Sequence, residues 1–331
     1  MLTLALLLFF LYSRHLPSNA TSQICIFAME KTIPLIALPP NENSSEMKEA
    51  AFGVSKALQT SGFLLVTSEH LPLALQRKAT QVASQILNEN SNENELIITH
   101  PSDPKIYAML DSLDQLGNLD VLDEQRLVLT QYWNALERVK EQVLDCISLG
   151  LGLPTEYFMN FHIKKNSALR LLHYPGETHE LQDSQNTIRC KPHSDYGSIT
   201  LLLTDGVPGL QALIQDEWIN VPHVEGALVV NIGSLMSEWT GGKLLATLHR
   251  VVSLVDNNAG CKPRTSIAFF ADPDEEISVT LKGGKAMNDQ RGDMTVAEYI
   301  KWRSGGSERG RSGLAFTNEE ESRVNKSQGK R

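Results

Sequence analysis

Hydrophobic and polar positions follow one period in the first half of the chain and another in the second. In the first half, apolar side chains recur at steps of three and four residues, which is the spacing of one helix face. They are Leu127, Val128, Tyr132, Leu136, Val139, Val143 and Ile147. This pattern predicts a long helix over residues 123–149. A polar stretch at 46–60, closed by Ser61-Gly62, predicts a shorter helix.

Short apolar runs predict strands on both sides of the long helix. Residues 33–38 and 63–66 are two such runs in the N-terminal half. After Asn166, runs rich in Val, Ile, Leu and Thr are separated by turn residues, at 169–173, 198–204, 210–214, 227–232, 248–255 and 265–270. Such a series is typical of an antiparallel sandwich or barrel. We therefore predict a mainly β, α+β fold, with a helical N-terminal region at 31–165 packed on a jelly roll at 166–303.

The two ends of the chain differ from this body. Residues 2–12 form an apolar run too short for a membrane-spanning helix, which takes about 20 residues. The run has the length of a signal-peptide core, but no Lys or Arg precedes it. Residues 1–30 are interpreted as a targeting segment or as the result of a misassigned start before Met29. A cytoplasmic location is favoured for the body of the protein, and a secretory or organellar location stays open. The Gly-, Ser- and charge-rich residues 304–331 predict a disordered tail.

Composition excludes several classes of protein. The 331 residues carry a formal net charge of −9 with a pI near 5.5, whereas a nucleic-acid-binding surface is basic. The cysteines are too widely spaced for a disulfide framework or a CxxC metal site; they are Cys25, Cys146, Cys190 and Cys261. A hydrophobic content of 41% is enough for a core. We expect a small-molecule substrate, no nucleic acid and no stable membrane span; the oligomeric state stays open.

Three residues of the second half have the character of a metal site. His193 and Asp195 are two positions apart, so on a strand their side chains point to the same side. His249 stands at the start of a later Val-rich strand. Two imidazoles and one carboxylate on one face of an ion leave the opposite face open, as in non-haem Fe(II) oxygenases. Each motif alone also fits an ordinary polar strand edge or a core histidine; their order along predicted strands favours the metal site.

Arg264 and Ser266 follow on the next predicted strand, again two positions apart. An arginine grips a carboxylate with two parallel hydrogen bonds, which suits a 2-oxo acid cosubstrate, and the hydroxyl adds a donor. Because the apolar run 267–270 comes directly after it, this arginine requires a partner. Arg189 and Lys191 flank the first metal motif and are interpreted as solvated charges, with contact to an acidic substrate as the alternative.

Together, these motifs resemble the Fe(II)/2-oxoglutarate-dependent dioxygenases of the isopenicillin N synthase-like superfamily, over about residues 31–303. The resemblance implies a double-stranded β-helix, His193, Asp195 and His249 as iron ligands, and Arg264 with Ser266 as the anchor for 2-oxoglutarate. The segment Leu171-Leu172-His173-Tyr174-Pro175 matches the family's cosubstrate-contacting segment, so Tyr174 is a further candidate. The implied cofactors are Fe(II), 2-oxoglutarate and O2.

The implied activity is oxidation, most simply hydroxylation, of a C–H bond in a small organic molecule, with release of succinate and CO2. Three alternatives stay open: an iron oxidase that does not use 2-oxoglutarate, a zinc hydrolase with the same ligands, and a non-catalytic jelly-roll binding protein. The chain departs from the family pattern at Leu172, where many plant members have Asn, and at Ser68-Glu69-His70. It also has Ser234 in place of Asp in the Asn-x-Gly-Asp pattern, and an enlarged loop at 256–260.

Overall fold

The computed structural model describes residues 32–40, 45–89, 96–100, 103–176, 188–253, 261–280 and 294–303. Except for Thr32, all of them belong to a unit that begins at Ile33. The interpretations of residues 1–30, of the tail at 304–331 and of the loop at 256–260 lie outside the described residues. The predicted partition of the body at 165/166 stays a prediction. Among the described helices, none is both long enough and apolar enough to cross a bilayer.

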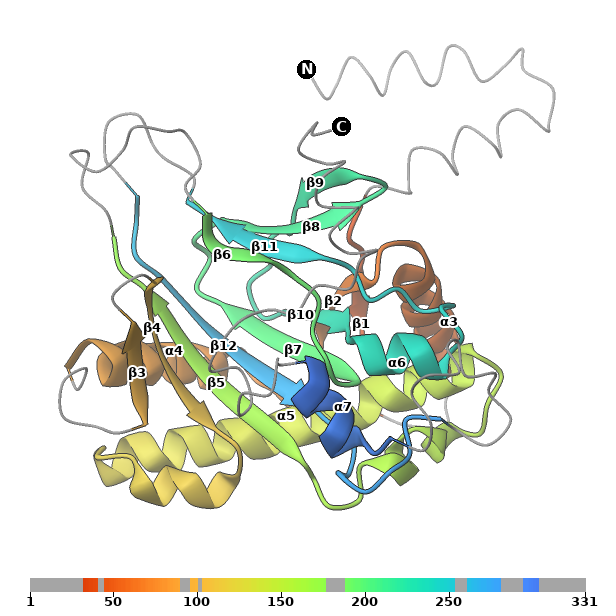
Figure 1. The fold of residues 1–331 in the computed structure, drawn as a ribbon, viewed down its shortest axis with the longest axis horizontal. Coiled ribbons are helices and arrows are strands. Elements are labelled where there is room, and N and C mark those ends of the chain that lie inside the picture. The colour runs from red at the N-terminus through yellow and green to blue at the C-terminus, as the bar shows by residue number, and fades with distance from the viewer. Residues whose placement is uncertain are drawn as a thin grey trace, which may run out of the picture. The chain divides into compact units, whose positions relative to one another are not determined.

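Two β-sheets form the centre of this unit (Figure 1). The larger sheet has eight strands, in spatial order β1 (Leu35–Ala37), β2 (Phe63–Thr67), β10 (Leu228–Ile232), β7 (Ile199–Thr204), β12 (Arg264–Ala271), β5 (Ser167–Tyr174), β4 (Asp103–Leu110) and β3 (Ile97–His100). The smaller sheet has the order β6 (Ile188–His193), β11 (His249–Val252), β8 (Leu210–Ile214) and β9 (Glu217–Asn220). Every pairing between these strands is antiparallel except that of β1 with β2.

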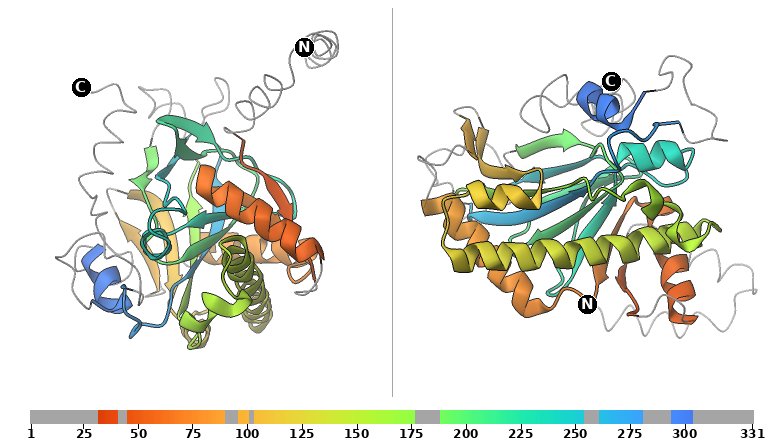
Figure 2. Two further views of the ribbon diagram at one scale, coloured as in Figure 1. Left: turned by 90° about the vertical axis from the view of Figure 1, so that its right-hand side faces the viewer. Right: turned by 90° about the horizontal axis from the view of Figure 1, so that it is seen from below.

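Helices cover the face of the larger sheet that points away from the smaller one. They are α3 (Ser45–Thr60), α4 (Leu73–Glu89) and α5 (Asp123–Gly150), and Figure 2 shows α5 running beneath the strands. Short helices α6 (Ser234–Trp239) and α7 (Val296–Arg303) lie near one another at the end of the sheets. The connections include 3-10 turns η1 (Leu113–Asn118), η2 (Thr155–Tyr157) and η3 (Met159–Phe161).

Alternation along the central strands separates two cores. The outward-facing positions of β5, β7 and β12 are buried apolar side chains beneath the helices: Leu169, Leu171, Leu201, Leu203, Ile267 and Phe269. The alternate positions face the smaller sheet, where Leu172, Tyr174 and Ala268 share a second cluster with Ala212 and Val251. This inner face holds the polar groups described below. A strand that is buried on both faces can therefore carry structure on one side and chemistry on the other.

The predicted fold class is confirmed, and so are several elements. The predicted helix at 123–149 corresponds to α5, and the strand at 210–214 corresponds to β8. The strand predicted at 248–255 is shorter, since β11 spans His249–Val252, and residues 254–260 lie outside the described part of the chain. The sequence analysis missed α4, α6, α7, β3, β4 and β9, and it expected a strand around His193 without giving the bounds of β6. In β6 the charged residues and Pro192 conceal the strand, and proline is tolerated there because β6 is an edge strand.

Candidate metal centre

The three predicted metal-binding residues come together at the ends of two neighbouring strands. His193 is the last residue of β6 and His249 is the first of β11, and these two residues are paired directly across the antiparallel ladder. Asp195 lies two residues beyond the end of β6. The expectation that His193 and Asp195 share a strand is therefore wrong. The chain leaves the sheet after His193, and this turn carries the carboxylate back toward both imidazoles.

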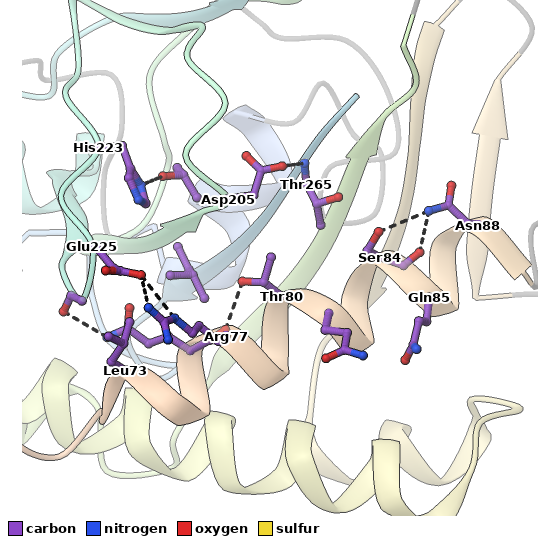
Figure 3. Close-up of a pocket in the computed structure, with 15 residues that line it drawn as sticks. Leu73, Arg77, Thr80, Ser84, Gln85, Asn88, Asp205, His223, Glu225 and Thr265 are labelled. Atoms are coloured by element: carbon purple, nitrogen blue, oxygen red, sulfur yellow. Dashed lines mark hydrogen bonds and ion pairs between the residues drawn. The ribbon is translucent and has the colours of Figure 1, made fainter. Parts of the chain in front are cut away.

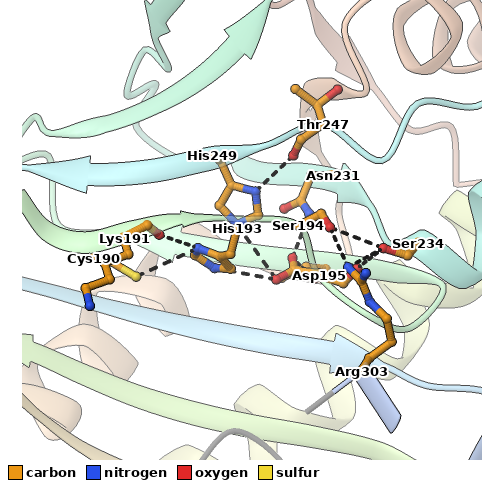
Figure 4. Close-up of polar contacts among 11 residues, drawn as sticks. Cys190, Lys191, His193, Ser194, Asp195, Asn231, Ser234, Thr247, His249 and Arg303 are labelled. Atoms are coloured by element: carbon orange, nitrogen blue, oxygen red, sulfur yellow. Dashed lines mark hydrogen bonds and ion pairs between the residues drawn. The ribbon is translucent and has the colours of Figure 1, made fainter. Parts of the chain in front are cut away.

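The ligand atoms of this triad face one another (Figure 4). Oδ1 of Asp195 lies 3.9 Å from Nε2 of His193 and 3.7 Å from Nε2 of His249. One ligand atom from each residue lies within 4.8 Å of the others, and the imidazole centroids are 4.2 Å apart. Three ligand atoms this close can surround one ion. Their role as metal ligands stays a prediction.

Backbone carbonyls fix the orientation of both imidazoles. Nδ1 of His193 lies 2.8 Å from the carbonyl oxygen of Lys191, and Nδ1 of His249 lies 3.2 Å from that of Thr247. Since a carbonyl only accepts, each Nδ1 carries the proton, and each Nε2 is left with a lone pair directed at the triad. The rings of Phe63 and His249 pack in a T-shaped contact, with their centroids 5.6 Å apart.

Two buried donors hold the carboxylate. Asn231 donates from Nδ2 to Oδ2 of Asp195 at 2.7 Å, and Thr200 donates from Oγ1 to the same oxygen at 2.5 Å. Oδ1 is thereby left on the side of the imidazoles. Sequence reasoning missed both residues as parts of the site, although Asn231 is the first residue of the Asn-x-Gly-Asp pattern. Donors that orient a ligating carboxylate commonly affect metal affinity.

Burial sets the protonation of the triad. Desolvation lowers the pKa of His249 to about 4, with a further contribution from His193, and desolvation also lowers the pKa of His193. Burial alone would raise the pKa of Asp195, but the two histidines, followed by the hydrogen bonds from Asn231 and Thr200, hold it below its usual value. Neutral imidazoles and an ionised carboxylate are the forms that bind a divalent cation.

Helix α7 braces the loop that carries Asp195. Arg303 is buried and donates from Nη2 to Oγ of Ser194 at 3.0 Å and to Oγ of Ser234 at 3.2 Å. Ser234 in turn donates to the carbonyl oxygen of Asp195 at 3.0 Å, and the Arg303 guanidinium lies 5.3 Å from the ring centroid of Tyr196. The serine that departs from the family pattern is thus a point of contact between the loop and the last described helix (Figure 4).

Arg264 and Ser266 lie on the inner face of β12, as the sequence predicts. Arg264 is only 2% exposed and donates from Nη1 to Oγ of Ser266 at 3.0 Å and from Nε to the carbonyl oxygen of Val207 at 3.3 Å. Its strand partner is Tyr174, whose ring centroid lies 5.7 Å from the guanidinium. The three residues predicted to contact a cosubstrate therefore adjoin one another. Their role in binding it stays a prediction.

Arg189 differs from its interpretation as a solvated charge. The residue is 3% exposed, and its guanidinium donates to the backbone carbonyl oxygens of Lys262 and Pro175. It also lies 5.3 Å from the ring centroid of Tyr174, on which Arg264 packs as well. Arg189 is therefore part of the buried framework around the predicted cosubstrate anchor.

A separate open cavity of about 560 Å³ lies on the helix-covered side of the larger sheet (Figure 3). Residues of α4, of the end of β7 and of the loops after β7 and β9 line it, together with Thr265 of β12. The Thr265 backbone N–H donates to the carboxylate of Asp205, and the Asp205 backbone N–H donates to the Thr265 carbonyl oxygen, so this pair closes the end of the strand. None of the triad residues lines this cavity, so it is a feature distinct from the predicted metal centre.

Known proteins resemble this chain over the region that contains the triad and Arg264. The model of the 2OG-Fe(II) oxygenase superfamily matches residues 165–273. The 2-oxoglutarate-Fe(II) type oxidoreductase ppzD of Metarhizium rileyi is 32% identical over 187 residues, which cover 51% of this chain and 52% of that protein. Probable flavonol synthase 5 of Arabidopsis thaliana is 28% identical over 273 residues, 75% of this chain and 78% of that protein. The first of these matches thus spans about half the length of the relative.

Among solved structures, a full-length Neurospora crassa protein in complex with alpha-KG and 5-formyluracil has a TM-score of 0.69 at 25% sequence identity. The superposition covers 80% of this chain and 92% of that one. The similarity therefore includes the helical N-terminal region as well as the jelly roll.

Proposed function

Because the chain belongs to the 2OG-Fe(II) oxygenase superfamily, we propose that it is an Fe(II)- and 2-oxoglutarate-dependent oxygenase that hydroxylates a C–H bond of a small organic substrate. The observation that carries the proposal is the convergence of His193, Asp195 and His249 beside the buried Arg264. Uracil derivatives are the first substrates to test, since the similar Neurospora crassa structure contains 5-formyluracil.

The donor set fits Fe(II). Two neutral imidazole nitrogens and one carboxylate oxygen, held from behind by backbone carbonyls and by Asn231 and Thr200, are the donor types of the facial arrangement in non-haem iron sites. When bound, iron supplies the oxidising chemistry together with 2-oxoglutarate and dioxygen, and the cosubstrate leaves as succinate and CO2. An ion bound there would have these three side chains as its protein ligands.

The protein's own contribution is to bind and orient. Arg264 would pair with the distal carboxylate of 2-oxoglutarate, because its guanidinium is held in place by Ser266 and by the Val207 carbonyl. Tyr174 forms one wall of this subsite, in contact with both Arg264 and Arg189. The apolar side chains of the inner face, among them Leu172 and Ala268, exclude water around the cosubstrate.

The decisive test is an anaerobic titration of Fe(II)-loaded protein with 2-oxoglutarate, followed by the visible charge-transfer band of the chelate. We expect the band in the wild type and a requirement for at least about 30-fold more 2-oxoglutarate in Arg264→Ala, as for loss of one partner of a buried charge pair. Arg138→Gln, which removes an exposed arginine of α5, serves as the matched control.

Other outcomes would contradict the proposal. Folded, iron-loaded protein without a band would exclude 2-oxoglutarate chelation and favour an iron oxidase. Protein that binds zinc but not Fe(II), with circular dichroism showing an intact fold, would favour a hydrolase. Unchanged affinity in Arg264→Ala would exclude Arg264 as the anchor while leaving the triad in place.

A further inference from the structure

A buried arginine connects the smaller sheet to the strands that carry the predicted cosubstrate anchor. Arg189 is the second residue of β6, an edge strand of the smaller sheet. Its Nη1 donates to the carbonyl oxygen of Lys262 at 3.2 Å, and its Nη2 donates to that of Pro175. Pro175 directly follows β5 and Lys262 lies two positions before β12, so one guanidinium reaches the ends of two paired strands of the larger sheet.

These strand ends are the ones that hold Tyr174 and Arg264. The two residues are paired across the ladder between β5 and β12. Two guanidiniums lie against the Tyr174 ring: Cζ of Arg189 is 5.3 Å and Cζ of Arg264 is 5.7 Å from its centroid. Arg189 bonds to the residue after Tyr174 and to the residue two positions before Arg264. A change at Arg189 therefore reaches both members of the anchor.

Asp205 places one negative charge near Arg264. Its carboxylate accepts the backbone N–H of Thr265, the residue after Arg264, at 2.5 Å and that of Val207 at 3.0 Å. The Val207 carbonyl oxygen in turn accepts the Nε–H of Arg264. Desolvation lowers the pKa of Arg264; among its charged neighbours, Asp205 opposes this change and Arg189 adds to it. Arg264 and Asp205 together are neutral, and a neutral pair attracts a further carboxylate only weakly.

Arg189 supplies the remaining positive charge. Its two acceptors are neutral backbone carbonyls, which bind the guanidinium without cancelling its charge. Its Nε is buried and, within the described part of the chain, has no hydrogen-bond partner. A buried cation compensated in this way is costly, and a nearby anion lowers the cost. With Arg189 included, the charges that act on one another at the anchor add up to one positive charge, which the distal carboxylate of 2-oxoglutarate would neutralise.

Packing alone does not account for a charged residue at this position. An uncharged amide side chain also donates to backbone carbonyls, and it is less costly to bury. Arginine adds a permanent charge and a rigid fork that bonds to two strands at once. The property that distinguishes Arg189 from a structural hydrogen-bond donor is therefore its charge.

We propose that Arg189 is a positioning residue of the cosubstrate subsite: it holds Tyr174 and Arg264 in place and supplies the positive charge that selects 2-oxo acids with a second carboxylate. The inference rests on the proposed function and specifies how this chain selects its cosubstrate. Arg189 acts on the distal end of the cosubstrate, through Arg264. Its effect should therefore be confined to the end of the molecule that does not chelate the metal.

The test is an anaerobic titration of Fe(II)-loaded protein with 2-oxoglutarate and, separately, with 2-oxopentanoate. The two acids share the chelating end and the length of the carbon chain, but only 2-oxoglutarate has a second carboxylate, and the charge-transfer band reports both. We expect Arg189→Gln to bind 2-oxoglutarate at least about 10-fold more weakly than the wild type does. Its affinity for 2-oxopentanoate should stay within about 3-fold. Arg189→Lys keeps the charge, so its affinity for 2-oxoglutarate should stay within about 3-fold.

Control measurements separate the charge of Arg189 from a structural role. Arg138→Gln makes the same substitution at an exposed position of α5 and should bind both acids as the wild type does. Circular dichroism and the melting temperature establish that each variant is folded. If Arg189→Gln does not fold, Arg189→Lys carries the test, because it keeps the charge without the fork.

The proposal is overturned if folded Arg189→Gln binds both acids as tightly as the wild type. It is also overturned if this variant loses affinity for both acids to the same degree, which is the result expected of a purely structural arginine. Loss of the preference for 2-oxoglutarate in folded Arg189→Lys contradicts it as well. Failure of the proposed function is a different result, because the wild type would then show no band with either acid.

Discussion

The two faces of strand β12 carry different kinds of buried side chain. On the outer face, Ile267 and Phe269 are fully buried among apolar side chains, and Phe269 meets Trp133 of α5 edge to face at 5.6 Å. On the inner face of the same strand, Arg264 and Ser266 are nearly as buried but hydrogen-bonded to each other. Burial thus stabilises the fold through apolar side chains on one side of the strand. On the other side it encloses polar groups that, under the proposed function, bind a ligand.

The difference follows from the cost of burying each kind of group. An apolar side chain gains free energy in proportion to the area removed from water. A charged or polar group loses its hydration and needs a partner in the folded protein, and the inner face supplies such partners to Asp195 through Asn231 and Thr200. We therefore expect mutations on the outer face to change stability and mutations on the inner face to change ligand affinity.

The mutation with the largest expected change in free energy lies on the outer face of β12. Phe269→Ala is expected to lower the free energy of unfolding by about 3–5 kcal/mol, because loss of the ring leaves a cavity against Trp133. The Fe(II) affinity of the folded protein should stay within a factor of about 3, as for independent sites. Urea unfolding of metal-free protein and Fe(II) titration measure the two quantities. A large loss of iron affinity in folded Phe269→Ala would break the comparison.

A smaller change in free energy is expected for a mutation on the inner face of the larger sheet. Asn231→Ala removes the donor to Oδ2 of Asp195 and should weaken Fe(II) binding by about 10–100-fold, the usual range for residues that orient a ligand. Asn88→Ala, which changes an exposed asparagine of α4, is the control and should leave the affinity unchanged. Competition with a chelator of known affinity measures both variants. Wild-type iron affinity in Asn231→Ala would show that Thr200 alone suffices.

The smallest effect concerns His162, a buried polar residue near the end of β12. Its Nδ1 lies 2.8 Å from the carbonyl oxygen of Phe158 and its Nε2 lies 3.0 Å from Oγ of Ser198. Burial lowers its pKa to about 3. An unfolded histidine titrates near pH 6.5, so below about that pH the unfolded chain binds a proton that the folded protein does not. The contribution of His162 to stability is therefore highest above this pH and falls as the pH decreases.

Urea unfolding at several pH values isolates this contribution. Between about pH 6.5 and about 5.5, the wild type should lose about 1 kcal/mol more than His162→Gln, because only the wild type takes up this proton on unfolding. The other buried histidines contribute equally to both proteins and cancel in the difference. Equal losses in the two proteins would mean that His162 takes up its proton at the same pH in the folded protein as in the unfolded chain.

Much of the framework was predictable because it depends on local pattern. The period of apolar residues identified α5, and the apolar run after Gly209 identified β8. The order of His193, Asp195 and His249 along predicted strands was enough to suggest that they meet, and the structure brings them together. The reason given for this expectation, that side chains alternate along one strand, was wrong, since Asp195 lies outside β6.

The parts that escaped prediction depend on contacts distant in sequence. Arg303 reaches Ser194 across 109 positions, and no local pattern marks either residue. Arg189 was interpreted as solvated because it begins a polar strand, yet the backbone at Pro175 and Lys262 receives its guanidinium in a buried position. Strand β6 has no apolar alternation because it is an edge strand. Charged residues in these positions can be interpreted only once the sheets are assembled.

The contact between Arg303 and Ser194 also has a consequence for the order in which the protein is made. During translation, the triad residues leave the ribosome well before α7, so the loop between His193 and Asp195 first exists without its brace. It becomes fixed only when the last described helix docks and closes a loop of 109 positions in the sequence. Synthesis thus delivers the predicted metal ligands before the residue that holds their loop.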